Sequence, residues 1–159
     1  MYKNPIIVFE GIEGSGKSHH ISIVCKYLKK NKIDYVKIRE PGGNKNSEKI
    51  RKLILNNNSN FNQNTDLLLY LAARSENIQL INKFYKKKII IIDRFIDSTI
   101  AYQHYGMGIN KNIINLLNKL ILRNIKPNFT FLNTVSMKNL KLRLNKRSNK
   151  NRYDNFKIT

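Results

Sequence analysis

Cysteine is nearly absent from this sequence, since Cys25 is the only one among 159 residues. A single cysteine cannot form a disulfide within the chain, and it cannot supply a cysteine metal cluster or a redox pair. No apolar run approaches the roughly 20 residues needed to span a bilayer. Residues 1–5 lead directly into a strand pattern, which leaves no room for a signal peptide. We therefore expect a protein of the reducing cytoplasm, with no membrane partner.

Acidic residues are also scarce. The chain carries 10 acidic against 30 basic residues, for a formal net charge of +20. Such a balance is typical of proteins that bind nucleic acid. However, the basic residues are scattered over predicted helix surfaces, and the abundance of Lys, Asn and Ile is typical of an AT-rich genome. We therefore expect small anionic substrates as partners in preference to nucleic acid.

Apolar patterning predicts strands that alternate with helices. Strands are predicted at residues 5–10, 35–39, 88–93 and 129–132, and the first and third are continuous enough to be buried in a parallel sheet. Helices are predicted at residues 17–30, 47–55 and 66–85, from 98 to about 106, at 111–124 and after Ser136. Thr65, Asn110 and Ser136 are the expected N-caps. This order predicts an α/β fold, a parallel sheet with helices on both faces, in a single domain over residues 1–159.

One segment matches the pattern G-x-x-x-x-G-K-[ST] in full and lies between a predicted buried strand and an amphipathic helix. Its glycines let backbone N–H groups surround the phosphates of ATP, and the helix N-terminus adds partial positive charge. The lysine is expected to neutralise phosphate oxygens and the final serine to hold Mg²⁺. The predicted ATP-binding residues are Gly11, Ile12, Glu13, Gly14, Ser15, Gly16, Lys17 and Ser18.

A second polar site is predicted at the end of the strand at residues 88–93. Asp93 lies at the carboxyl edge of the sheet, where a carboxylate suits Mg²⁺ and its waters. Its alternative role is to cap the next helix. Arg94 follows and would point to the opposite side of the chain if the strand continued. An arginine there can bind a second phosphate through two hydrogen bonds.

Several segments together resemble the thymidylate kinase family. They are residues 9–18 (FEGIEGSGKS), 39–43 (REPGG), 68–74 (LLYLAAR), 93–95 (DRF), 97–103 (DSTIAYQ) and 127–132 (PNFTFL). The resemblance implies a three-layer P-loop kinase fold, phosphorylation of dTMP to dTDP with ATP and Mg²⁺, and a homodimer. The family fold continues past the end of this sequence, so we expect its last strand and helix to be missing.

The resemblance also implies residue roles at the acceptor site. Glu13 would contact the deoxyribose 3′-hydroxyl and the phosphate–magnesium region, and Arg39 and Arg94 would hold the dTMP phosphate. The remaining roles concern the nucleoside: Tyr70, in place of a phenylalanine, would stack on thymine, Arg74 and Thr99 would bind its edges, and Tyr102 would crowd the 2′ position. Each of these residues also has an ordinary structural interpretation, and it is their joint spacing that favours a site.

Residues 141–154 correspond to the family's lid. The phosphate loop contains no arginine, while Arg143, Arg147 and Arg152 crowd the lid, which resembles the type with a catalytic lid arginine. Arg147 and Arg152, with Lys17 and Arg94, are the predicted catalytic residues. A solvated basic helix end is the alternative for this run. Three alternatives remain for the function. The chain could be another kinase of the same fold, a truncated nucleotide-binding copy with poor turnover, or a nucleic-acid-binding P-loop protein.

Overall fold

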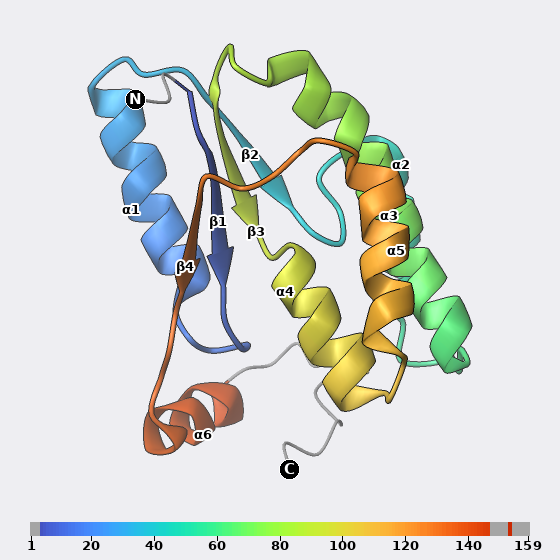
Figure 1. Ribbon diagram of the computed structural model, residues 1–159. Helices are drawn as coiled ribbons and strands as arrows, with labels where there is room; N and C mark the ends of the chain where they lie inside the picture. Colours follow the sequence, from blue (N-terminus) through green and yellow to red (C-terminus); the bar gives the residue numbers. More distant parts are fainter. Residues whose placement is uncertain (1–3, 147–152, 154–159) are drawn as a thin grey trace.

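The computed structural model describes residues 4–146 and 153 of the chain. Its strands run parallel in one sheet, in the order β2-β3-β1-β4 (Figure 1). The strand bounds are Ile6–Glu10 for β1, Tyr35–Arg39 for β2, Ile89–Asp93 for β3 and Phe129–Leu132 for β4. The predicted strands and the parallel sheet are thus confirmed.

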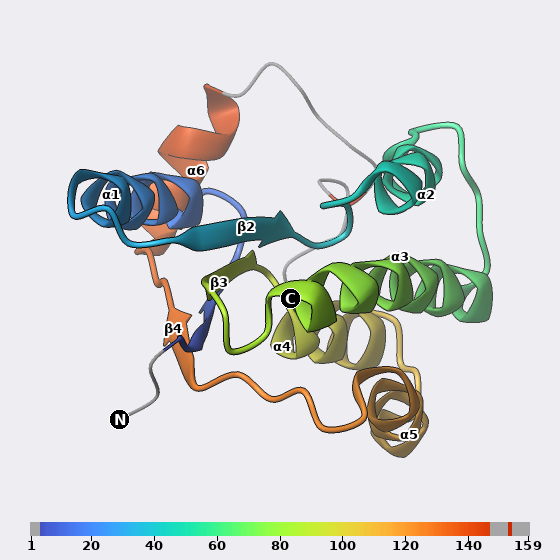
Figure 2. The ribbon, with the colours of Figure 1, turned by 90° about the horizontal axis from the view of Figure 1, so that it is seen from above.

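The two faces of the sheet are covered by different helices, as Figure 2 shows. On one face, Phe9 and Ile91 pack against Ile21 and Leu28 of α1 (Lys17–Lys30). The opposite face packs against α3 (Gln63–Phe84) and the end of α5 (Lys111–Leu122), and this core cluster comprises Ile6, Val8, Ile38, Ile81, Ile90, Ile92, Phe95, Leu122 and Ile125. Because successive side chains of a strand point to opposite faces, an all-apolar strand serves both layers. The predicted three-layer α/β architecture is confirmed.

Asparagine side chains set the starts of two helices earlier than expected. Helix α2 (Lys45–Leu55) is capped by Asn44, whose side chain accepts a hydrogen bond from the backbone N–H of Ser47. Helix α3 is capped in the same way by Asn62, which accepts from Thr65. The predictions that α2 begins near Ser47 and that Thr65 caps a helix beginning at residue 66 were therefore wrong. Asparagine caps as well as serine or threonine do, so Asn44 and Asn62 were eligible caps that the prediction overlooked.

Between β3 and α5 the chain forms α4 (Ile96–Thr99) and a π-helical segment, η1 (Ile100–Gly106). The helix expected from Ser98 therefore begins two residues earlier than predicted and widens after its first turn. π-Helical turns are rare and frequently occur at functional sites. The expected caps Asn110, for α5, and Ser136, for α6 (Met137–Asn145), are confirmed by their hydrogen bonds.

All strands end at the same edge of the sheet, where the loop between β1 and α1 and helix α6 lie (Figure 1). In open α/β sheets, ligands bind outside the carboxyl ends of the strands. Within the described part of the chain, no helix is both long and apolar enough to cross a membrane.

Candidate active site

The phosphate loop turns sharply at the end of β1. Gly11 has a φ of 137°, and a Cβ there would lie 2.3 Å from the carbonyl oxygen of Asn133. Only glycine fits such a position. Gly16, with a φ of 94°, leads directly into α1, whose first turn carries no acidic residue. The positive end of the α1 dipole therefore faces the loop, an arrangement that binds phosphate.

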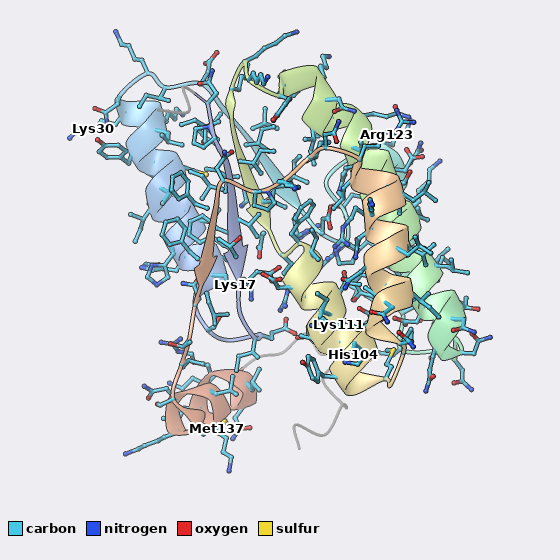
Figure 3. All side chains as sticks on the ribbon, viewed as in Figure 1. Lys17, Lys30, His104, Lys111, Arg123 and Met137 are labelled. Atoms are coloured by element: carbon cyan, nitrogen blue, oxygen red, sulfur yellow. The ribbon has the colours of Figure 1, made fainter. Side chains whose placement is uncertain are left out.

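Lys17 lies at this end of α1, and Lys30 marks the opposite end (Figure 3). The side chain of Lys17 is buried and folds back on the loop. Its Nζ donates to the carbonyl oxygens of Gly11 at 2.7 Å and Ile12 at 3.0 Å. Burial lowers the pKa of Lys17 to about 8, and the positive charge of Arg94 acts in the same direction. An anion bound beside Lys17 would favour its charged form.

A cavity of about 600 Å³, named here the loop cavity, opens along this loop. Its lining includes the predicted ATP-binding residues from Glu13 to Ser18. The other lining residues are His19, His20, Arg39, Glu40, Arg51, Asp93, Arg94 and Arg143. Most of the charged residues in this second group are cationic, which suits a polyphosphate.

Two oxygen ligands suitable for Mg²⁺ face the loop cavity. Asp93 is only 9% exposed, and its Oδ1 has no hydrogen-bond partner among the described residues. Ser18 is exposed in the first turn of α1. Helix α4 has no side-chain cap, so the alternative role of Asp93 as its cap was wrong. Because Mg²⁺ usually binds through one or two carboxylates together with waters and substrate phosphates, these residues fit an ion that arrives with a nucleotide.

The described residues also contain no group of three or more His, Cys, Asp or Glu side chains that could hold a metal ion. An ion held by Asp93 and Ser18 would need further ligands, such as waters and substrate phosphates.

A second cavity, of about 270 Å³ and named here the aromatic cavity, adjoins the first. Three tyrosines, Tyr70, Tyr102 and Tyr153, contribute to its wall. Burial raises the pKa of Tyr70 to about 12, so its phenol stays protonated near neutral pH. The other lining residues are Glu13, Glu40, Pro41, Arg51, Leu55, Arg74, Arg94, Phe95, Ser98 and Thr99. Such a mixture of aromatic rings with polar and charged groups suits a planar polar ring that carries a phosphate.

Arg74 forms the polar floor of the aromatic cavity. It is 2% exposed, and its Nε donates to Glu40 at 2.7 Å. The same guanidinium donates to Asn118, to the carbonyl oxygen of Phe95 at 2.8 Å and to the hydroxyl of Thr99 at 3.0 Å. Burial raises the pKa of the Glu40 carboxyl, and the Arg74 charge opposes that rise. These bonds hold Arg74 rigidly while leaving one of its N–H groups unused by the described residues.

Arg94 connects the two cavities because it lines both. Its φ of 67° ends the strand geometry at Asp93. The condition under which Asp93 and Arg94 were expected to point to opposite sides of the chain is therefore not met, and both residues line the loop cavity. A non-glycine residue at positive φ is costly and persists where surrounding structure holds it. The guanidinium donates to Ser98 at 3.3 Å and lies 5.5 Å from the centre of the Tyr102 ring.

Glu10 supplies the surrounding structure that fixes this turn. Its buried carboxylate accepts hydrogen bonds from the backbone N–H groups of Phe95, at 2.7 Å, and Ser98, at 3.2 Å, and from the Ser98 hydroxyl. Glu10 had no predicted role, because a carboxylate at the end of a buried strand has no partner until β1 and β3 are paired.

Two further arginines stand beside the loop cavity. Arg39 is about half exposed and pairs with Glu48 at 2.8 Å. Arg51, which the sequence analysis missed because it reads as an ordinary helix charge, lines both cavities and donates to the carbonyl oxygen of Pro41 at 2.6 Å. Burial and the charge of Arg39 lower the pKa of Arg51. Arg51 therefore reaches the aromatic cavity, whereas Arg39 lines the loop cavity alone.

The lid residues are described in part. Arg143 of α6 lies over the phosphate loop, with Nη1 donating to the carbonyl oxygen of Gly14 at 2.8 Å. Arg147 and Arg152, the predicted catalytic lid residues, lie outside the described residues. Of the other predicted site residues, Glu13, Arg74, Arg94, Thr99, Tyr70 and Tyr102 come together around the aromatic cavity.

Comparisons with known proteins agree with this arrangement. A family model described as Thymidylate kinase matches residues 9–159. Thymidylate kinase of Kosmotoga olearia is 40% identical over 126 residues, covering 78% of this chain and 61% of the relative. That of a Sulfurihydrogenibium species is 45% identical over 129 residues, covering 79% and 63%. The chain thus spans about three fifths of the length of these two relatives.

Among solved structures, the crystal structure of thymidylate kinase from Ehrlichia chaffeensis superposes with a TM-score of 0.76 at 38% identity. The match covers 89% of this chain and 78% of that one. At this similarity the two chains share one fold, so the predicted P-loop kinase architecture is confirmed.

Proposed function

Because the chain belongs to the thymidylate kinase family, we propose that it transfers the γ-phosphate of ATP to dTMP, forming dTDP for DNA synthesis. The observation that carries the proposal is the junction of two cavities of different chemistry. The loop cavity offers backbone N–H groups and cations, and the aromatic cavity offers rings and Arg74. Glu13, Glu40, Arg51 and Arg94 line both. A phosphate donor and a nucleotide acceptor can therefore meet at these residues.

The acceptor explains why no catalytic base is required. A phosphate monoester has its second pKa near about 6, so dTMP is already mostly a dianion at neutral pH. Catalysis then depends on alignment and on neutralising charge. Lys17 holds the ATP phosphates, and Arg94, with Arg51 or Arg39, holds the acceptor phosphate. Arg147 and Arg152 remain our candidates for the lid residue that stabilises the transferred group.

Magnesium is part of the proposal, with Ser18 and Asp93 as its protein contacts. When bound, it supplies positive charge to the phosphates and helps to align them. Asp93 is suited to this role because its buried Oδ1 lacks a hydrogen-bond partner in the described part of the chain.

For the nucleoside, we propose that Tyr70 stacks on thymine and that Arg74 and Thr99 bind the base edge. The Arg74 network supports this, since a rigid donor loses little entropy on binding. Tyr102, beside Arg94, would crowd a ribose 2′-hydroxyl. Glu13 lines both cavities and is the candidate for the 3′-hydroxyl.

A homodimer and a cytoplasmic location belong to the proposal as well. Ile113, Leu116 and Leu120 of α5 are 51%, 67% and 72% exposed. Their spacing places them along one stripe of the helix, and a second copy would cover it. Sedimentation of Leu116→Glu against the unmodified chain tests this: the variant should be monomeric at concentrations where the parent is dimeric. The single cysteine favours a reducing compartment.

The activity itself is tested by chromatography of reactions that contain the chain, ATP, Mg²⁺ and one acceptor. We expect dTDP from dTMP and little product from dUMP, dCMP or thymidine. Preferred turnover of another acceptor would assign a different kinase of the same fold. DNA-stimulated ATP hydrolysis without dTDP would assign a nucleic-acid-dependent ATPase, and binding of both nucleotides without turnover would assign a nucleotide-binding copy.

A further inference from the structure

Tyr153 lies far along the chain from the other residues of the aromatic cavity, yet it contributes directly to the wall. Its ring packs edge-to-face against Tyr70 and against Tyr102, with centroid distances of 6.0 Å and interplanar angles of 78° in both cases. Edge-to-face contacts at this distance are favourable for aromatic pairs. The ring therefore touches the two tyrosines that the proposed function assigns to the base and the sugar.

The phenol of Tyr153 is held by Asp66, in the first turn of α3. The hydroxyl lies 2.9 Å from Oδ1 and 2.7 Å from Oδ2 of the Asp66 carboxylate. A hydrogen bond from a neutral hydroxyl to a carboxylate is stronger than one between neutral groups. Asp66 is only 1% exposed, so solvent competes little for this bond.

Asp66 is itself fixed from the interior of the molecule. Its Oδ1 accepts a hydrogen bond at 3.1 Å from the side chain of Gln103, a fully buried residue of η1. A chain of contacts therefore runs from Gln103 through Asp66 to the Tyr153 hydroxyl, and the Tyr153 ring ends it between Tyr70 and Tyr102. The buried Asp66 carboxylate binds both Gln103 of η1 and the Tyr153 hydroxyl, so it fixes the position of the Tyr153 phenol at the cavity wall.

We propose that Tyr153 is an acceptor-recognition residue of the aromatic cavity, and that Asp66 is the positioning residue that orients it. This inference rests on the proposed function, because it takes a nucleoside monophosphate as the occupant of the cavity. Tyr153 narrows the space available to a planar ring and excludes water from the side formed by Tyr70 and Tyr102. Its contribution acts on acceptor binding and leaves the phosphate loop untouched, since Tyr153 does not line the loop cavity.

The test compares Tyr153→Phe, Tyr153→Ala and Asp66→Asn in the full chain, with affinities for dTMP and for ATP measured separately by calorimetry. Tyr153→Phe keeps the ring and removes the hydroxyl that Asp66 binds. We expect dTMP to bind about tenfold more weakly, the factor of one hydrogen bond to a charged group, with ATP affinity within twofold of the parent. Tyr153→Ala should weaken dTMP further, because the wall is lost. Asp66→Asn should resemble Tyr153→Phe.

Combining the two substitutions tests whether Asp66 acts through Tyr153. Adding Asp66→Asn to Tyr153→Phe should cost little beyond either single change, since both changes act on the bond between Tyr153 and Asp66. Tyr105→Phe is the matched control, because Tyr105 belongs to η1 and is 76% exposed outside the cavity; it should change neither affinity. Additive effects, or equal losses of dTMP and ATP binding, would overturn the inference in favour of a purely structural role.

A direct readout is available because the chain contains no tryptophan. Tyr153→Trp places the only indole at the wall of the aromatic cavity, so its emission should shift on titration with dTMP and stay constant with ATP alone. If dTMP binds the unmodified chain and the indole does not respond, the placement of Tyr153 is wrong while the proposed function stands. Failure of dTMP to bind the unmodified chain would instead overturn both.

Discussion

The loop cavity and the aromatic cavity share part of their walls but are built in different ways. Most of the loop cavity comes from one continuous segment, residues 13–20, which includes Gly14 and Gly16 at positive φ. The aromatic cavity is assembled from the ends of β2 and β3 and from α2, α3, α4 and η1, together with Tyr153. When one backbone turn makes a site, a single substitution in that turn should abolish binding. When many side chains make a site, each substitution should remove only part of the affinity.

The two cavities also differ in how their charges are satisfied. In the aromatic cavity, Arg74 is already paired with Glu40 and bonded to neighbouring oxygens. In the loop cavity, the hydrogen-bond partners of Lys17 among the described residues are carbonyl oxygens, and its pKa is lowered by burial and by Arg94. One cavity is therefore organised before a ligand arrives, and the other holds cations that an anion would stabilise.

The largest effect should come from Lys17→Ala. The proposed function assigns Lys17 to the ATP phosphates, so we expect kcat to fall by about 100- to 1000-fold, as for loss of a group that stabilises transition-state charge. The aromatic cavity does not include Lys17, so dTMP affinity should stay within twofold. Lys30→Ala, at the far end of the same helix (Figure 3), is the control and should be neutral. A parallel loss of dTMP binding would show that the cavities are not separable.

Arg94→Ala should affect the binding of both nucleotides, because Arg94 lines both cavities. We expect dTMP binding to weaken by about 1.5–3 kcal/mol, the cost of losing a charged hydrogen-bond partner, with a smaller change for ATP. The control is Arg123→Ala, because Arg123 also has a positive φ, of 52°, but caps the distant end of α5. Comparing the Arg94→Ala and Arg123→Ala variants shows how much of the effect comes from placing alanine at a positive φ. Equal losses for both nucleotides would assign Arg94 to the donor instead.

The same contrast explains what the sequence could predict. The strands, α1 and the phosphate loop follow from local patterns, and the structure bears them out. Arg94 could not be placed correctly, because its φ depends on the contact between Glu10 and the backbone of Phe95, which joins residues 85 positions apart. Arg51 and Tyr153 were missed for a related reason: each reaches the aromatic cavity only through contacts with residues far away in the sequence.

The resemblance to a known family reached further than local patterns did. It named Tyr70, Arg74, Thr99 and Tyr102, which the structure brings around one cavity. It did not indicate that Arg74 is held by Glu40 and Asn118, because such a network depends on β2, α3 and α5 together. The roles of these residues in binding remain predictions.

A pH titration should show an intermediate effect confined to the loop cavity. With a pKa of about 8, Lys17 in the free protein loses its proton as the pH rises through that value. Phosphates bind the cation, so ATP affinity should be nearly constant below this range and fall above it by up to about tenfold per unit, as linkage requires. Calorimetry in buffers of different ionisation enthalpy should show proton uptake on ATP binding at pH 9. A constant affinity from pH 7 to 9 would mean that Lys17 keeps an ordinary pKa.

The smallest effect should come from Tyr70→Phe, which tests the aromatic cavity alone. Burial raises the pKa of Tyr70 to about 12, so the phenol is neutral across the working range and the change removes no charge. The ring that would stack on thymine is kept, and its edge-to-face contact with Tyr153 depends on the ring.

We therefore expect dTMP affinity within about threefold of the parent, less than the roughly 1 kcal/mol typical of one neutral hydrogen bond. Tyr70→Ala removes the ring and should weaken dTMP binding by at least about tenfold, on the scale of burying one large apolar side chain. Calorimetric titration of both variants with dTMP distinguishes the two contributions. A large loss with phenylalanine would mean that the Tyr70 hydroxyl binds the acceptor, and a small loss with alanine would mean that the base lies elsewhere in the cavity.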